Sequence, residues 1–170
     1  MGARQRVPEL QLVDRELARV AALEASFPGL TPTNYSAESP IDGRYNCIAY
    51  AANDTTQWWW PSDQSLGGHF WPPSAPKERT LDAFRIAFES LGYRTCVNGK
   101  REDEIEKVAI YVNEQGKPTH AARQLASGVW VSKMGPHVDI EHETPEAVGG
   151  HEDHGYGVVA IYMARQLASS

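Results

Sequence analysis

The sequence has little of what membrane-spanning and nucleic-acid-binding proteins need. No window approaches about 18 consecutive apolar residues, the length that crosses a bilayer as a helix, and the first residues lack the apolar core of a signal peptide. Positive charge is scarce: 16 Lys and Arg against 22 Asp and Glu give a net charge of −6, and an acidic chain repels nucleic acid and anionic lipid. We therefore expect a cytoplasmic protein without a nucleic-acid or membrane partner.

Cysteine is also scarce, with only Cys47 and Cys96 in 170 residues. Two thiols in a reducing cytoplasm predict no disulfide, and a lone cysteine is most often a small buried hydrophobic residue. Cys96 keeps that interpretation. Cys47 differs because it opens CIAYAAND, an alanine-rich stretch that predicts a helix. Unpaired amides at a helix start favour the thiolate, so Cys47 is a candidate nucleophile.

The chain does contain a run of helical patterns followed by a run of strand patterns. Helices are expected over 8–25, 47–55 and 80–91, the last with Thr80 as its N-cap and Gly92 closing it. Strands are expected over 94–97, 107–112, 119–125, 129–133, 138–142 and 155–165. Helices followed by antiparallel strands predict the α+β class. We expect an N-terminal helix and strap over 1–39 and one domain over 40–170, packed as a single compact unit.

A cysteine nucleophile needs a nearby imidazole and a polar group that orients the imidazole. Of the six histidines, His120 is the best placed, because it lies at the start of the predicted strand 119–125. Asp139, in the extended segment after the next hairpin, is the preferred orienting group. A carboxylate both fixes the imidazole tautomer and stabilises the imidazolium. Ser132, on the intervening strand, is the alternative.

Tryptophan is concentrated in residues 58–76, which hold four of the five tryptophans. Such rings usually pack in cores, and they also stack on ligands. Three adjacent tryptophans cannot all face one way, so we expect at least one to lie near a cleft. Gln124 shares the predicted strand face of His120, because every second residue points the same way. The candidate substrate-binding residues are Trp58, Trp59, Trp60, Trp71 and Gln124.

A metal site is a further hypothesis for the His- and Asp-rich segments HVDIEH and GGHEDHG. Such clusters suit transition metals, and this hypothesis competes with the nucleophile hypothesis for Asp139. The candidate ligands are His137, Asp139, His142, His151 and His154. We favour the nucleophile, and therefore expect no metal and no cofactor, with a small molecule or a peptide as substrate.

Several uncommon strings in the chain resemble an uncharacterised family of small bacterial proteins. They include NCIAYAANDTTQWWWP and THAARQLASGVWVSKMG, and the resemblance extends from about Pro40 to Met163. More loosely, the order of a cysteine on a helix, a histidine on a strand and a later polar residue resembles the papain-like and NlpC-type cysteine hydrolases. That resemblance implies Cys47 as nucleophile, His120 as general base and Asp139 as orienting group.

The expected function is therefore that of a cysteine-dependent hydrolase or transferase acting on an amide or thioester bond. The expected fold is papain-like or NlpC-like, with N-terminal helices packed on an antiparallel sheet. A non-catalytic binding protein on the same fold, using the tryptophan-rich segment to recognise a partner, is the alternative.

Overall fold

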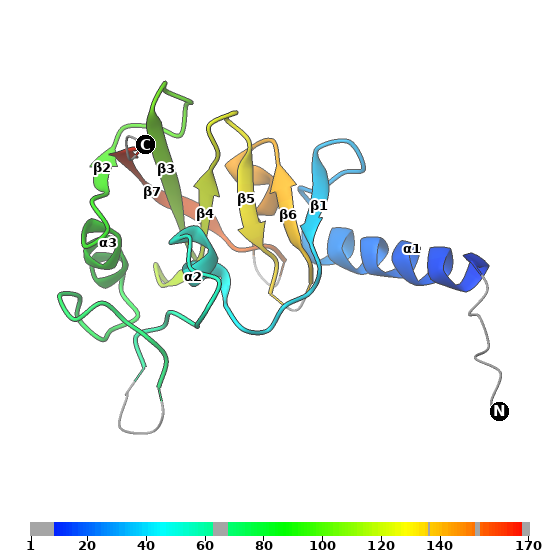
Figure 1. Cartoon of the computed structure of the whole chain (residues 1–170), viewed down its shortest axis with the longest axis horizontal. Helices are drawn as coiled ribbons and strands as arrows, with labels where there is room; N and C mark the ends of the chain where they lie inside the picture. The colour runs from blue at the N-terminus through cyan, green and yellow to red at the C-terminus, as the bar shows by residue number, and fades with distance from the viewer. Residues whose placement is uncertain (1–8, 63–67, 136, 152–153, 168–170) are drawn as a thin grey trace.

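Segments rich in Val, Ile, Tyr and Ala recur in the second half of the chain, and they form most of an antiparallel sheet. The structure is a computed structural model that describes residues 9–62, 68–135, 137–151 and 154–167. Seven strands are ordered β1-β6-β5-β4-β3-β7-β2 across the sheet (Figure 1). They are β1 (Tyr35–Ser39), β2 (Arg94–Cys96), β3 (Ile105–Val112), β4 (Pro118–Gln124), β5 (Trp130–Lys133), β6 (Asp139–His142) and β7 (Val158–Gln166).

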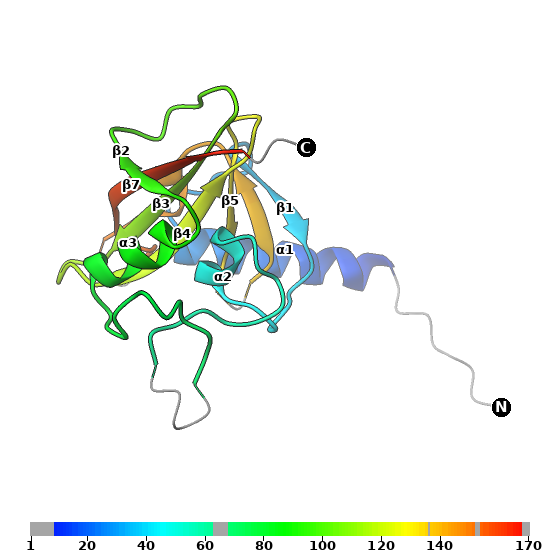
Figure 2. The same cartoon turned by 60° about the vertical axis from the view of Figure 1, so that its left-hand side comes forward.

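Helices cover both faces of this sheet. Helix α2 (Cys47–Ala51) packs on β4 and β5, and α3 (Leu81–Glu89) packs on β2 and β3. Figure 2 shows these two helices on the same face, with α1 (Glu9–Ser26) behind the sheet. The end of α1 and the 3₁₀ helix η2 (Pro145–Val148) contribute to the core of that second face. The mixed α and β class predicted from the sequence is confirmed.

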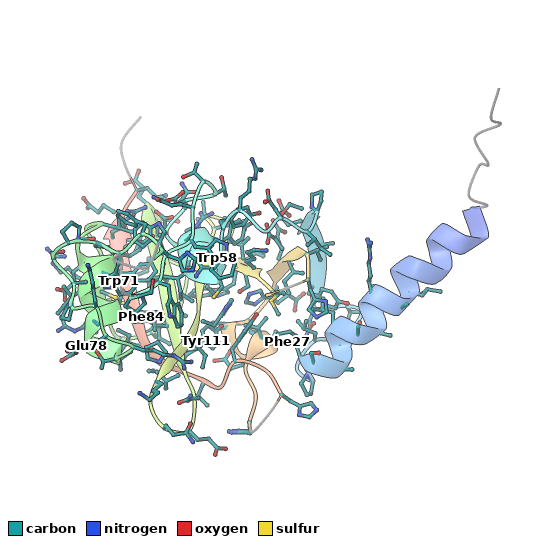
Figure 3. All side chains as sticks on the ribbon, turned by 90° about the horizontal axis from the view of Figure 1, so that it is seen from below. Phe27, Trp58, Trp71, Glu78, Phe84 and Tyr111 are labelled. Atoms are coloured by element: carbon teal, nitrogen blue, oxygen red, sulfur yellow. The ribbon has the colours of Figure 1, made fainter. Side chains whose placement is uncertain are left out.

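Strand β3 divides the core into two clusters, because its alternate side chains point to opposite faces. Val108 and Ile110 pack with α2 and α3, while Ala109 and Tyr111 pack with α1 and η2. Figure 3 shows the two groups apart: Trp71 and Phe84 lie beside α3, and Phe27 and Tyr111 lie toward α1. A residue's position along a strand therefore decides which cluster its side chain joins. The clusters are named here the α2 face and the α1 face.

The two ends of α3 lie close to the predicted signals. The Thr80 hydroxyl accepts a hydrogen bond from the amide of Ala83 at 3.2 Å, which makes Thr80 the N-cap of α3. Gly92 has a φ of 93°, a conformation that glycine adopts without strain. Helix α2 is shorter than expected because Asn53 turns left-handed, with a φ of 62°. Within the described ranges, no helix is both long enough and apolar enough to cross a membrane.

Two secondary-structure elements of the fold, one strand and one 3₁₀ helix, were not predicted from the sequence. Strand β1 pairs with β6 at the sheet edge. It lies within the segment 27–43, whose prolines and glycines predict an irregular connection. Its middle residues are exposed, so it carries no apolar alternation to reveal it. As a result, the last residues of the expected strap, 35–39, belong to the sheet of the domain. The second missed element is η2, a single turn that opens with Pro145.

Candidate functional site

Cys47 is the first residue of α2, and Asn46 fixes the start of that helix. The Asn46 side-chain oxygen accepts hydrogen bonds from the amides of Ala49 and Trp59, both at 3.1 Å. Its side-chain nitrogen donates to the carbonyl of Trp59 at 2.8 Å. Asn46 therefore ties the helix start to the tryptophan-rich segment. The half-buried thiol of Cys47 lies 4.0 Å from the carbonyl oxygen of Thr119 on β4.

The electrostatics of Cys47 combine opposing effects. Burial is the largest, and it raises the pKa of the thiol to about 11. The backbone amides of Ala121, Ile48 and Cys47 itself act in the opposite direction, as does the ammonium of Lys133. The helix-start effect predicted from the sequence is thus present, but burial outweighs it. At neutral pH the thiol is protonated, and it needs a base to become a nucleophile.

His120 is fully buried on β4 and held on three sides. Its Nε2 atom lies 2.9 Å from the Ser132 hydroxyl oxygen. Its ring stacks on Tyr156 with centroids 3.9 Å apart and planes 3° from parallel, and Tyr111 lies edge-on. The other ring nitrogen, Nδ1, has no hydrogen-bond partner among the described residues. Burial, with a smaller effect of His142, lowers the pKa of His120 well below 6.5, so the imidazole is neutral.

Cys47 and His120 meet at the same end of β4. Thr119, whose carbonyl contacts the sulfur, and Ala121, whose amide favours the thiolate, are the two residues that flank His120. Tyr156 stacks on His120, and burial, with a smaller effect of the Cys47 thiolate, raises the pKa of the Tyr156 hydroxyl. In the part of the chain that the structure describes, no hydrogen bond joins the sulfur to the imidazole. The two groups are neighbours across the β4 backbone.

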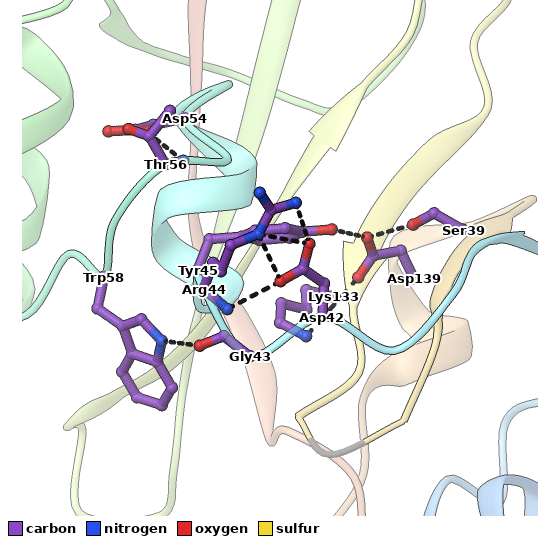
Figure 4. A network of polar contacts seen from close by, with 10 residues as sticks. All are labelled: Ser39, Asp42, Gly43, Arg44, Tyr45, Asp54, Thr56, Trp58, Lys133 and Asp139. Atoms are coloured by element: carbon purple, nitrogen blue, oxygen red, sulfur yellow. Dashed lines mark hydrogen bonds and ion pairs between the residues drawn. The ribbon is translucent and has the colours of Figure 1, made fainter.

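Asp139 is not the group that holds His120, which corrects the preferred sequence interpretation. Its carboxylate accepts hydrogen bonds from Ser39 and Tyr45 and lies 3.9 Å from the Lys133 ammonium (Figure 4). Asp139 and Lys133 pair across β5 and β6 and face α2. Side chains alternate along a strand, so Asp139 points away from the face on which the His120 ring packs. The alternative, Ser132, holds the imidazole.

A second histidine continues the chain of contacts beyond Ser132. The Ser132 hydroxyl oxygen lies 2.8 Å from Nε2 of His142, whose Nδ1 lies 2.7 Å from the carbonyl oxygen of Thr144. Burial lowers the pKa of His142 to about 4. The sequence suggested His142 only as a metal ligand. Within the described ranges, no group of three or more His, Cys, Asp or Glu side chains is arranged to hold a metal ion.

The tryptophans mostly pack in the core of the α2 face, against which Cys47 also packs. Trp59 and Trp71 are 5% and 2% exposed, and their indole nitrogens donate to Asp54 and to the carbonyl of Pro76. Trp60 is partly buried and packs against the α2 face, the cluster that contains Trp59 and Trp71. Trp58 is 41% exposed and donates to the carbonyl of Gly43 (Figure 4). Of the four, Trp58 presents the most surface to a ligand.

Gln124 shares a strand face with His120 but lies at the opposite end of β4. It is buried, and its side-chain nitrogen donates to the carbonyls of Gly99 and Gly128. These contacts tie two loops to the sheet. Gln124 therefore has a structural task in this fold, distant from the thiol.

Comparison with known proteins adds one finding about ancestry. Neither the curated proteins nor the solved structures contain a match to this chain. A family model does match, and it spans most of the sheet together with α2 and α3. The chain belongs to the family described as Domain of unknown function (DUF7689), over residues 36–164.

Proposed function

We propose that this protein is a cysteine-dependent hydrolase or transferase acting on an amide or thioester bond. Cys47 is the nucleophile, His120 is the general base and Ser132 holds the imidazole. One observation carries the proposal. Buried His120 has Nε2 engaged by Ser132 and Nδ1 without a hydrogen-bond partner among the described residues, and it lies on the strand whose backbone contacts the Cys47 thiol. A nucleophile at a helix start beside a strand histidine also supports a papain-like arrangement.

The reaction follows from these groups. His120 Nδ1 takes the proton of the Cys47 thiol, and the sulfur adds to the carbonyl carbon of the acyl donor. The imidazolium returns that proton to the departing amine or thiol, which leaves an acyl thioester on Cys47. Water or another acceptor then loses a proton to His120, attacks the thioester carbonyl and releases the acyl product with a neutral thiol restored.

In the resting protein the proton remains on the thiol. Thiol and imidazole are both neutral, because burial raises the pKa of one and lowers the pKa of the other. A charged pair forms only when the proton moves, and the backbone amides at the start of α2 and the Lys133 ammonium favour the resulting thiolate. Catalytic hydrogen bonds are often long before substrate binds, so a separated pair in the resting protein is compatible with turnover.

Acylation by activated esters and thioesters tests the proposal. We expect a p-nitrophenyl ester or an aryl thioester to add one acyl group to the protein, located on Cys47 by peptide mapping. The Cys47→Ala and His120→Ala variants should lose the adduct, because they remove the nucleophile and its base. Cys96→Ala is the matched control and should keep it. Acylation of Cys96 and Cys47 at equal slow rates, unaffected by His120→Ala, would contradict the proposal.

A non-catalytic binding protein is the second candidate, favoured by the raised pKa of Cys47 and by the exposed ring of Trp58. In that case no acyl group accumulates, and a ligand changes the tryptophan fluorescence. The Trp58→Phe variant separates the two functions, because it should alter fluorescence changes on binding and leave acylation of Cys47 intact.

A further inference from the structure

We infer that His142 is a positioning residue that acts through Ser132 to keep His120 protonated on Nε2 and unprotonated on Nδ1. The contribution of His142 to catalysis rests on the proposed function, in which Nδ1 of His120 receives the thiol proton. The hydrogen-bond geometry carries the tautomer assignment by itself. The three side chains, called here the histidine relay, are His120, Ser132 and His142.

The donor and acceptor of each hydrogen bond in the relay follow from the contact between His142 and the carbonyl of Thr144. The carbonyl oxygen of Thr144 can only accept, so Nδ1 of His142, 2.7 Å away, carries a proton. In a neutral imidazole the other nitrogen is then an acceptor, and the Ser132 hydroxyl donates to Nε2 of His142 at 2.8 Å. The Ser132 oxygen, having donated its only proton, accepts from Nε2–H of His120 at 2.9 Å. Nδ1 of His120 is left with a free lone pair.

Burial makes the opposite tautomer unfavourable. His120 and Ser132 are 0% exposed and His142 is 1% exposed, so the polar atoms of the relay depend on one another for hydrogen bonds. If His120 carried its proton on Nδ1, the lone pair of Nε2 would face the oxygen of Ser132, whose proton is already given to His142. Two acceptors would then oppose each other in a buried site, which is costly.

The relay also explains how a site without a carboxylate beside the base can work. A triad carboxylate holds the histidine in the tautomer whose free nitrogen faces the nucleophile. Here a neutral second histidine fixes the tautomer of the base through a hydroxyl. When Nδ1 of His120 takes the thiol proton, Nε2–H still donates to Ser132, so the relay keeps its direction through the reaction.

The assignment can be tested on the wild-type protein by nuclear magnetic resonance. Long-range ¹H–¹⁵N spectra of the imidazole rings at pH 7 should show His120 protonated at Nε2 and His142 protonated at Nδ1. Assignment uses His120→Ala and His142→Gln, each of which removes one set of signals. Protonation of His120 at Nδ1 in the wild-type protein would overturn the inference, whatever the protein's activity.

Variants test the action of His142 on His120. His142→Leu removes the acceptor, so the Ser132 hydroxyl becomes free to donate to Nε2 of His120, and the Nδ1–H tautomer should appear. Alkylation of Cys47 should then slow by about tenfold, a part of the ~10²–10⁴-fold that a general base supplies. His142→Gln retains an acceptor oxygen and should recover the Nε2–H tautomer and much of the rate. His69→Gln, an exposed histidine outside the relay, is the matched control.

The outcomes separate the inference from the proposed function. An unchanged His120 tautomer in His142→Leu contradicts the role of His142, and Ser132→Ala provides the same test if the Leu variant does not fold. The predicted tautomers together with an unreactive Cys47 would support the relay and contradict the enzymatic proposal.

Discussion

At pH 4.5 the free energy of unfolding is expected to be lower than at pH 7, by about 2 kcal/mol from His142 alone. His142 has a pKa of about 4 in the folded protein because of burial, while an unfolded histidine has a pKa of 6.5. Between these values the unfolded chain binds a proton that the folded protein does not. Stability is therefore complete above about pH 6.5 and falls as the pH decreases toward 4.

The size of the effect follows from 1.36 kcal/mol per pKa unit, which gives about 3 kcal/mol over the whole window. His120 acts in the same direction, since burial lowers its pKa as well. Urea denaturation at pH 7 and pH 4.5 measures the change. His142→Gln should show a weaker dependence on pH than the wild-type protein. Identical pH dependence in His142→Gln and wild type would contradict a buried neutral His142.

Replacing Trp71 with alanine is expected to lower the free energy of unfolding by about 3–5 kcal/mol, the usual cost of truncating a buried tryptophan. Trp71 is 2% exposed and packs on Phe84 with ring centroids 4.9 Å apart. Removing the ring leaves a cavity beside α3 and frees the carbonyl of Pro76, which accepts from the indole at 2.9 Å. Urea denaturation at pH 7 provides the measurement.

The matched control is Trp58→Ala, because Trp58 belongs to the same segment but is 41% exposed. Its replacement should cost no more than about 1 kcal/mol, mainly from the lost hydrogen bond to Gly43. Equal destabilisation by both variants would show that the exposed ring carries as much packing energy as the buried one. A small effect at Trp71 would show that the tryptophan-rich segment is not part of the core.

Local signals predicted most of the helices and strands. Thr80 and Gly92 bound α3 as expected, because capping and the left-handed turn depend on a few adjacent residues. Strands β3 to β7 follow the predicted apolar segments closely. Strand β1 was missed because an exposed edge strand is stabilised by its pairing with β6, and pairing leaves no pattern in a single segment.

The arrangement of the candidate site follows in part from the sequence. Cys47 and His120 lie at one end of β4, but Ser132 rather than Asp139 engages the imidazole. The deciding information is the register of β5 with β6, which pairs Lys133 with Asp139 and sends both side chains to the α2 face. Register depends on contacts between strands, so the segment around Asp139 does not reveal its own partner.

The pKa of Cys47 also could not be predicted from the local sequence alone. A helix start predicts a lowered pKa, and the backbone amides do act in that direction. The burial that outweighs them comes from β4 and the surrounding core, far away in the sequence. Likewise, the role of Tyr156 could not be anticipated, because its ring reaches His120 only through the turn that precedes β7.

Alkylation of the two cysteines by iodoacetamide at pH 7 tests the pairing of Cys47 with His120 most directly. A thiol with a pKa of about 11 reacts slowly at this pH unless a neighbouring base removes its proton. We predict that Cys47 is labelled faster than Cys96, and that His120→Ala reduces the rate at Cys47 by about 10²-fold without changing Cys96. Slow labelling of Cys47 that is unaffected by His120→Ala would contradict the pairing and leave Cys47 as a packed structural thiol.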